Sequence, residues 1–249
     1  MRAIILAAGV GARLGSGEDH PPKAMLKFGG KTLFQRHLEI LEACGIEEVV
    51  TVTGYRGQLF EAEINRLGAQ GFVRQLDNPH FREGSVVSLW TAREELEKGE
   101  DILVMDADVL YDARMITRLM GSGAANRFLM DRDFEPGDEP VKLCLKDGRL
   151  VDFHKKIKNP FDESGESVGF FRFSPEIARR LAQRTQSYVD DGRRDEWYEE
   201  AVRDELLAGP VEAFGYEDVT GLPWIEIDFA EDVERAEKEI LPNLQEVEQ

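Results

Sequence analysis

Two glycines, an arginine and a lysine follow an apolar run at the start of the chain. Residues 3–8 have the length of a buried strand and lead into Gly9, Gly11 and Arg13, and Lys23 follows a short distance later. Glycines after a strand let backbone N–H groups approach an anion closely, and the two cations add positive charge there. These residue types in this order predict a loop that holds a triphosphate.

Other glycine-rich loops fit the spacing less well. Gly9, Gly11 and Gly15 read GxGxxxG, whereas the dinucleotide fingerprint is GxGxxG and needs an acidic residue at the end of the second strand, which here ends in Gly54-Tyr55-Arg56. The kinase-type P-loop requires Gly-Lys-Ser/Thr, which does not occur. A plain strand and turn with permissive glycines is the structural alternative.

Two aspartates stand directly after another apolar run. Asp106-Ala107-Asp108 follows residues 102–105, and residues two apart on a strand share a face, so both carboxylates can enter one site at the strand's carboxyl end. Two adjacent anions are costly unless a cation joins them, and Mg²⁺ with one or two carboxylates and phosphate oxygens meets that need. A strand-end turn with solvated aspartates is the alternative.

The opening residues resemble the nucleotidyltransferase superfamily that makes nucleotide-activated sugars and alcohols. Its signature, LAAGxGxRL followed by PK, is present at residues 6–14 and at Pro22-Lys23. The resemblance implies that the loop wraps a nucleoside triphosphate, with Arg13 and Lys23 on its phosphates. The nucleotide-binding set that it implies is Leu6, Ala7, Ala8, Gly9, Gly11, Arg13, Lys23, Gly84, Ser85 and Asp106.

The resemblance also implies that Asp108 is a metal ligand and that a second ligand comes from near the C-terminus, at Asp228. Arg13, Lys23, Asp108 and Asp228 are then the catalytic residues. Asp228 could instead be a helix N-cap with Glu231 at the capping-box position. Ser85, similarly, could simply cap the helix that follows it.

Within the superfamily, the chain is most similar to cytidylyltransferases that act on phospho-alcohols, of the phosphocholine, inositol-1-phosphate and phosphonate types. The opening motif and three further segments carry this resemblance: residues 88–90 with 106–108, residues 197–199, and residues 226–228. Residues 138–142 lack the Trp or Tyr expected to surround a quaternary ammonium, which weakens choline as an acceptor and leaves that acceptor open.

Four residues form the predicted acceptor-binding set: Lys142, Lys155, Glu166 and Trp197. The two lysines resemble the phosphate-binding residues of the inositol-phosphate enzymes, and Glu166 matches a position that holds an acceptor hydroxyl in sugar-phosphate relatives. Glu166 could also be an ordinary acid at the start of a strand. Nearby Lys156 and Lys158 are expected to be solvated, and His154 to be structural.

The composition excludes some classes of partner. Acidic residues outnumber basic ones 49 to 31, which gives a net charge of −18 and argues against nucleic acid or an anionic membrane as partner. Cys44 and Cys144 lack metal-type spacing and are expected to be small buried residues in a reducing compartment. Without a visible secretory leader or an apolar run of about 20 residues, the chain is expected to be cytoplasmic, with no membrane insertion. A homodimer is left open.

Strand and helix patterns alternate up to about residue 120. Strands are predicted at residues 48–53, 71–75 and 102–105, and helices near residues 33–44, 59–67 and 86–96. Further strands follow near residues 128–130, 140–145, 150–153, 170–173 and 224–227, and helices near residues 175–181, 197–207 and 229–240, the last with Phe229, Val233, Ala236 and Ile240 on one face.

This alternation predicts a Rossmann-like α/β fold, a mainly parallel mixed sheet with helices on both faces, of the nucleotide-diphospho-sugar transferase type. Residues 1–249 are predicted to form one domain, with a nucleotide-binding half at about 1–120 and an acceptor-binding half at about 121–249.

The predicted function is an Mg²⁺-dependent transfer of a nucleoside monophosphate from a nucleoside triphosphate, with CTP favoured. The acceptor is a phosphorylated small alcohol or a phosphonate, and pyrophosphate is released. A sugar-1-phosphate nucleotidylyltransferase that uses UTP, GTP or dTTP is the alternative enzyme. The alternative from another class is a nucleotide-sensing module without turnover.

Overall fold

The computed structural model describes residues 1–14, 20–134 and 140–245 of the chain. Gly15 of the glycine spacing, and Asp138 and Glu139 of the segment without Trp or Tyr, lie outside the described residues. Within those ranges, none of the helices combines the length and the apolar character needed to cross a bilayer.

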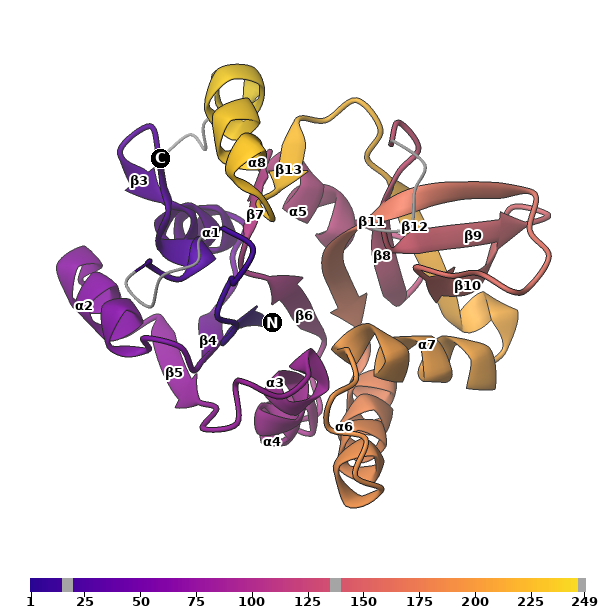
Figure 1. Ribbon diagram of the computed structural model, residues 1–249. Helices are drawn as coiled ribbons and strands as arrows, with labels where there is room; N and C mark the ends of the chain where they lie inside the picture. Colours follow the sequence, from indigo (N-terminus) through magenta and orange to yellow (C-terminus); the bar gives the residue numbers. More distant parts are fainter. Residues whose placement is uncertain (15–19, 135–139, 246–249) are drawn as a thin grey trace.

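One large sheet runs through both halves of the chain (Figure 1). Its strands lie in the order β10 (Arg149–His154), β9 (Lys142–Lys146), β11 (Glu163–Phe173), β6 (Ile102–Asp106), β1 (Arg2–Ala7), β4 (Glu48–Thr53) and β5 (Val73–Asp77). Off this path, β8 (Asn126–Asp131) pairs with β11 and with β12 (Phe214–Asp218).

The first-half strands β6, β1, β4 and β5 are parallel to one another. Alternate side chains of β1 enter different clusters: Ala3, Ile5 and Ala7 face one side of the sheet, and Ile4 faces the other. Because both faces of a parallel sheet are covered by helices, its strands are apolar throughout, as the opening run of the sequence is.

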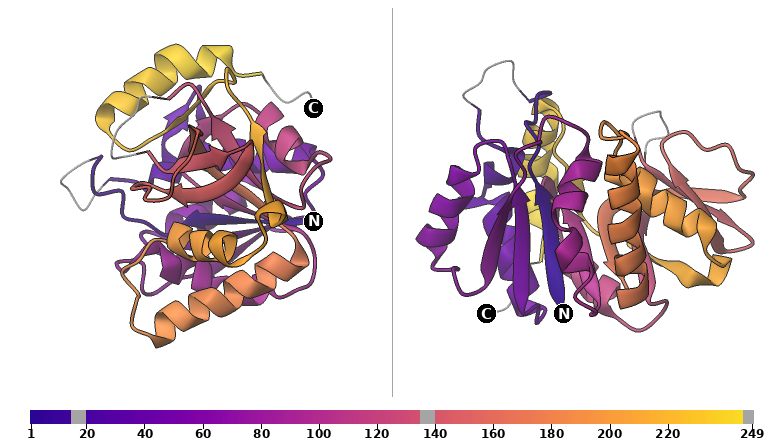
Figure 2. Two further views of the ribbon diagram at one scale, coloured as in Figure 1. Left: turned by 90° about the vertical axis from the view of Figure 1, so that its right-hand side faces the viewer. Right: turned by 90° about the horizontal axis from the view of Figure 1, so that it is seen from below.

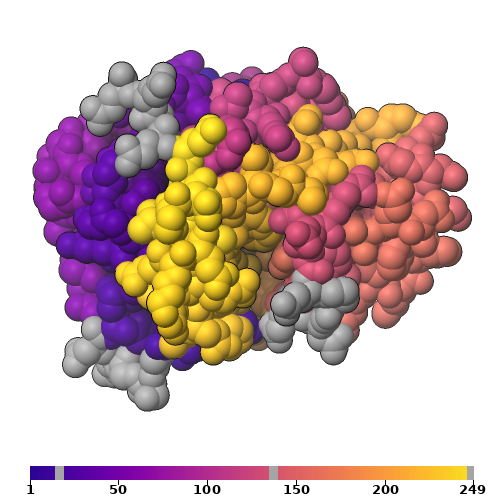
Figure 3. Space-filling model, turned by 90° about the horizontal axis from the view of Figure 1, so that it is seen from above, coloured from indigo at the N-terminus to yellow at the C-terminus, as the bar shows by residue number. Residues whose placement is uncertain are grey.

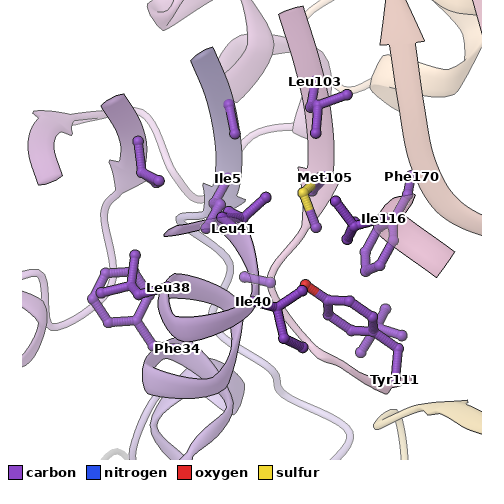
Figure 4. Packing of buried hydrophobic residues seen from close by; sticks show 14 of the residues in the cluster. Ile5, Phe34, Leu38, Ile40, Leu41, Leu103, Met105, Tyr111, Ile116 and Phe170 are labelled. Carbon is purple, nitrogen blue, oxygen red and sulfur yellow. The ribbon is translucent and has the colours of Figure 1, made fainter. Parts of the chain in front are cut away.

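Helices cover both faces of the sheet. On one face lie α1 (Leu33–Ala43), α2 (Gln58–Leu67) and α5 (Arg114–Met120), whose apolar residues pack on β1, β6 and β11 (Figure 4). The other face carries α3 (Ser85–Thr91), α4 (Arg93–Leu96), α6 (Pro175–Asp190) and α7 (Tyr198–Ala208). Figure 2 shows the sheet in edge view between α6 and the C-terminal helix.

The long antiparallel strand β11 joins the two halves. Its end at residues 170–173 pairs with β6, and its beginning at residues 163–166 pairs with β9. The register of β11 against β8 shifts between Ser167 and Phe171. The same sheet therefore continues from parallel strands into an antiparallel region.

The C-terminal segment returns to the first half of the chain. Strand β13 (Trp224–Glu226) pairs with β7 (Val109–Tyr111), which directly follows Asp108. The segment continues through α8 (Ala230–Arg235), the π-helical η3 (Ala236–Ile240) and η4 (Leu241–Asn243). Figure 3 shows it lying between the N-terminal half and the strands of the second half. This return brings residues 226–228 to the end of β6.

Two short elements complete the first half: the 3-10 turn η1 (Lys23–Met25) and the hairpin of β2 (Lys27–Phe28) and β3 (Lys31–Thr32). The 3-10 turn η2 (Val211–Ala213) precedes β12.

The predicted fold class is confirmed. The strands predicted near residues 140–145 and 150–153 form a hairpin, β9 and β10, around Lys146-Asp147-Gly148. Several bounds differ. Strand β5 begins two residues later than predicted, the helix predicted at residues 86–96 is divided at Ala92, and β11 and α6 extend well beyond residues 170–173 and 175–181. The patterns of β7 and β12 were missed because such short strands carry little periodicity.

Candidate active site

A cavity of about 330 Å³ opens at the carboxyl ends of β1 and β6. Its walls are Leu6, Ala7, Ala8, Gly9, Gly11, Pro22, Lys23, Ala24, Phe81, Glu83, Gly84, Ser85, Ser88, Asp106, Ala107, Asp108, Trp197 and Tyr198. The opening motif and the aspartate pair therefore share one cavity, as expected where parallel strands end at a common edge.

The end of β4 supports the glycine loop. The backbone N–H of Tyr55 donates to the Ala8 carbonyl over 3.1 Å, and the side chains of Tyr55 and Arg56 both donate to the His20 carbonyl over 3.1 Å. Gly11 has φ +65°, and a Cβ there would lie 3.1 Å from Lys23 Cγ. The loop thus turns where a glycine is favoured, close to the lysine side chain.

Lys23 lies between the two predicted metal-binding aspartates. Its Nζ donates to Asp108 Oδ2 over 2.9 Å and to Asp228 Oδ1 over 2.6 Å, and Arg13 Nη1 lies 3.3 Å from Asp228 Oδ2. Burial acts to lower the pKa of Lys23, but the charges of Asp108 and Asp228 outweigh it and raise that pKa. The structure thus brings together all four predicted catalytic residues.

A third carboxylate, which the sequence analysis did not include, joins this group. One carboxylate oxygen from each of Asp108, Glu226 and Asp228 lies within 4.8 Å of the others. Burial, followed by the charges of Asp108 and Asp228, raises the pKa of Glu226 to about 8. Oxygen donors at this spacing suit a hard divalent cation, and the Lys23 ammonium between two of them shows that the site accommodates positive charge. The residues present fit Mg²⁺.

The capping alternatives are wrong. The N-cap of α8 is Phe229, and Asp232, not Glu231, accepts from the backbone N–H groups of Asp228 and Phe229. The Asp228 carboxylate is therefore turned toward Lys23 and Arg13. Phe229 is 39% exposed instead of packed on the apolar face of the helix, and the Arg13 guanidinium lies 5.6 Å from its ring centroid.

Asp106 enters the cavity beside Asp108 but makes a different contact. Tyr198 Oη donates to Asp106 Oδ2 over 2.9 Å. Burial, followed by the charges of Glu199, Asp108 and Glu226, raises the pKa of Asp106 well above its usual range. Gly169 has φ +80°, and a Cβ there would lie 2.2 Å from Asp106 Oδ2. The bulged part of β11 thus leaves the room that Asp106 occupies.

Gly84 and Ser85 line the cavity, as the resemblance implied. Ser85 is not an N-cap, because the N-cap of α3 is Gly84, and Ser85 Oγ accepts from the backbone N–H of Tyr198 over 2.9 Å. A Cβ on Gly84 would lie 2.1 Å from the Glu196 carbonyl oxygen. Both residues thus hold the segment before α7 against the start of α3.

The predicted acceptor residues lie at the second-half end of the cavity. Trp197 lines the cavity and is 45% exposed, and Lys155 Nζ lies 4.7 Å from the centroid of its ring. Lys142 Nζ donates to the Lys155 carbonyl over 3.0 Å. Glu166 pairs with Lys142 across β11 and β9. Among these four residues, only Trp197 is part of the cavity wall.

Two carboxylates on this side lie in an unfavourable environment. Burial, followed by the charge of Asp131, raises the pKa of Glu166 to about 7, whereas the charges of Lys142 and Lys155 act to lower it. Burial likewise raises the pKa of Glu199 to about 7, and Lys155 again opposes the shift. Glu199 Oε2 is buried and has no hydrogen-bond partner among the described residues. His154 Nε2 lies 2.6 Å from Glu200 Oε1.

Curated relatives are similar over nearly the whole chain, at low identity. CTP:phosphoglutamine cytidylyltransferase of Campylobacter jejuni is 23% identical, over 94% of this chain and 98% of the relative. CMP-5'-(3-aminopropyl)phosphonate synthase of Streptomyces rubellomurinus is 28% identical, over 97% of this chain and 39% of the relative. The bifunctional IPC transferase and DIPP synthase of Rubrobacter xylanophilus is 29% identical, over 96% of this chain and 52% of the relative. The chain thus spans about half of the last protein and less of the one before it.

Solved structures share the fold. The inositol-1-phosphate CTP transferase of T. maritima superposes with a TM-score of 0.76 at 20% identity, over 97% of this chain and 95% of that one. CTP:phosphocholine cytidylyltransferase of Streptococcus pneumoniae superposes with a TM-score of 0.74 at 22% identity, over 95% and 97%. The sequence profile of the MobA-like NTP transferase domain matches residues 3–150, more than half of the chain. The chain is a nucleotidyltransferase and belongs to the family of MobA-like NTP transferase domains.

Proposed function

We propose that the protein transfers a cytidylyl group from CTP to a phosphorylated small alcohol or a phosphonate, with Mg²⁺ bound by Asp108 and Asp228, and releases pyrophosphate. The observation that carries this proposal is the meeting of Asp108, Glu226 and Asp228 beside the signature loop, with Lys23 in contact with both aspartates. The names of the relatives, a cytidylyltransferase and a CMP-phosphonate synthase, support the base and the class of acceptor.

The chemistry requires charge neutralisation more than a base. An oxygen of the acceptor phosphate or phosphonate attacks the α-phosphorus, a new P–O bond forms, and the bond between the α-phosphorus and its bridging oxygen breaks as pyrophosphate leaves. The nucleophile is already an oxyanion, so the obstacle is the repulsion between two anions.

Each part of the chain has a role in lowering that repulsion. Lys23 and Arg13 leave the aspartates for the triphosphate and its leaving group, which they stabilise. Asp108 and Asp228, with Glu226 beside them, hold the Mg²⁺ that neutralises phosphate charge when bound. The backbone of the glycine loop orients the triphosphate. Trp197 on the cavity wall, with Lys155, Lys142 and Glu166 next to it, serves the acceptor.

A substrate matrix tests the proposal. Purified protein with Mg²⁺ is incubated with each of CTP, UTP, GTP and dTTP against phosphocholine, aminoethylphosphonate, inositol-1-phosphate, glycerol phosphates and hexose-1-phosphates, and pyrophosphate is measured. We expect release with CTP and a phospho-alcohol or phosphonate. A preference for a hexose-1-phosphate with UTP, GTP or dTTP would instead identify a sugar nucleotidylyltransferase. Absence of pyrophosphate with every pair would contradict turnover on these acceptors and favour a nucleotide-sensing module.

A further inference from the structure

An ammonium group lies next to the cavity wall on the acceptor side, at the corner formed by Trp197 and Lys155. Lys155 Nζ lies 4.7 Å from the centroid of the Trp197 indole, the distance at which a cation is attracted to an aromatic face. Trp197 lines the cavity and exposes 45% of its surface. An aromatic face next to an acidic group is also what a ligand ammonium would need. Here a side chain of the protein takes that position.

The charge around this corner explains why a lysine is stable there. Lys155 acts on the carboxylates of Glu199 and Glu166 and opposes the effect that burial has on both. The charge of Asp108 also raises the pKa of Glu199. The charge of Lys155 thus acts on carboxylates from both α7 and β11.

We propose that Lys155 determines acceptor specificity: its ammonium lies against the Trp197 ring of the cavity wall, so the acceptor presents an uncharged hydroxyl group there and not an ammonium. This inference rests on the proposed function. A cationic head group would meet Lys155 at close range, where like charges repel.

A hydroxyl group, in contrast, matches what the corner offers. It can accept a hydrogen bond from the Lys155 ammonium, which an ammonium group of an acceptor cannot do. The exposed Trp197 face can pack against the carbon skeleton of the same acceptor. The corner thus provides a hydrogen-bond donor and an apolar surface.

A matched pair of acceptors tests this inference directly: 2-hydroxyethyl phosphate and phosphoethanolamine differ only in a hydroxyl group against an ammonium. We expect kcat/KM of the wild-type protein to favour the hydroxyl acceptor by at least about tenfold, since the ammonium is repelled by Lys155. Lys155→Met keeps the length of the side chain but removes its charge. It should reduce that preference by about tenfold or more, through a gain with phosphoethanolamine.

Two further variants separate specificity from structure. Lys155→Arg keeps the charge and should keep the preference. Lys156→Met removes the neighbouring exposed lysine and should leave the ratio unchanged. A purely structural role of Lys155 would lower both rates equally and leave the ratio as it was, which would overturn the inference. A wild-type preference for phosphoethanolamine would overturn it too, while leaving cytidylyl transfer intact. Absence of turnover with every acceptor of the substrate matrix would instead contradict the proposed function itself.

Discussion

The two halves of the cavity hold their charges in different ways. On the nucleotide side, cations and carboxylates are in direct contact: Lys23 lies 2.9 and 2.6 Å from Asp108 and Asp228. On the acceptor side, Lys155 acts on Glu166 and Glu199, carboxylates whose pKa burial raises to about 7. Under the proposed function, the first arrangement exchanges its internal ion pairs for a metal and phosphates. In the second arrangement the Lys155 ammonium lies against the Trp197 ring, where under the same proposal it selects between acceptors.

The largest effect is expected from a substitution on the nucleotide side of the cavity. Asp108→Asn removes one carboxylate charge from the cluster with Glu226 and Asp228, and kcat should fall by at least about 1000-fold because metal binding supplies several kcal/mol of charge stabilisation. Steady-state pyrophosphate release measures this. Asp77→Asn, at the exposed end of β5, is the matched control and should retain activity. Unchanged kcat in Asp108→Asn would refute the metal assignment.

Metal removal should have an equally large but reversible effect. Chelation with EDTA should abolish pyrophosphate release, because three carboxylates in one cluster without a divalent cation cannot neutralise the phosphates. Added Mg²⁺ should restore the rate, and circular dichroism should show the same fold throughout. Full activity in EDTA would contradict the role given to Asp108 and Asp228.

A smaller effect should separate the two sides. Lys155→Ala removes the ammonium over Trp197, so KM of the acceptor should rise by about tenfold or more while KM of CTP changes by less than about twofold, since the side chain serves one substrate only. Initial rates with each substrate varied in turn give both constants. Equal changes in the two constants would remove the distinction between the sides.

The boundary between the sides can be tested at Tyr198. Tyr198→Phe removes the hydroxyl that donates to Asp106 Oδ2 over 2.9 Å. One lost hydrogen bond is worth about 0.5–1.5 kcal/mol, so kcat should fall by roughly 2- to 10-fold without loss of fold. Wild-type kcat in this variant would show that Asp106 needs no support from α7.

The smallest expected effect concerns stability against pH. Glu166 has a pKa of about 7 in the folded state against 4.5 ordinarily, with burial as the main cause. The folded state therefore holds its proton more tightly than the unfolded state, and stability contributed by this group is lost as pH rises from about 4.5 to about 7. In thermal unfolding, Tm of the wild-type protein should fall over this pH range by a few kelvin more than Tm of Glu166→Gln. This corresponds to a loss of about 1–2 kcal/mol of stability from the protonated Glu166. An identical pH dependence in both proteins would contradict the raised pKa.

The sequence could predict the nucleotide side because its residues follow strand ends. Asp106 and Asp108 come directly after an apolar run, and parallel strands end at a common edge, so their meeting with the glycine loop follows from local patterns. Glu226 could have been found in the same way, since it stands two residues before Asp228. It was missed because only the residue matched by the family resemblance was considered.

The acceptor side could not be predicted to the same depth. Tyr198 contacts Asp106 across 92 positions of the sequence, and Lys155 reaches Trp197 from a different element. Such pairs depend on how the antiparallel strands and α7 pack together, and the hydrophobic periodicity of a single segment does not reveal that packing. The lysines were recognised by type and position, but their contacts came only from the fold.

The most direct test of the account is anomalous diffraction from crystals grown with CTP and Mn²⁺ in place of Mg²⁺. We expect an anomalous peak within coordination distance of carboxylate oxygens of both Asp108 and Asp228, with the Lys23 ammonium moved from between them onto the triphosphate. A peak elsewhere, or a nucleotide bound with Lys23 still paired to both aspartates, would contradict it.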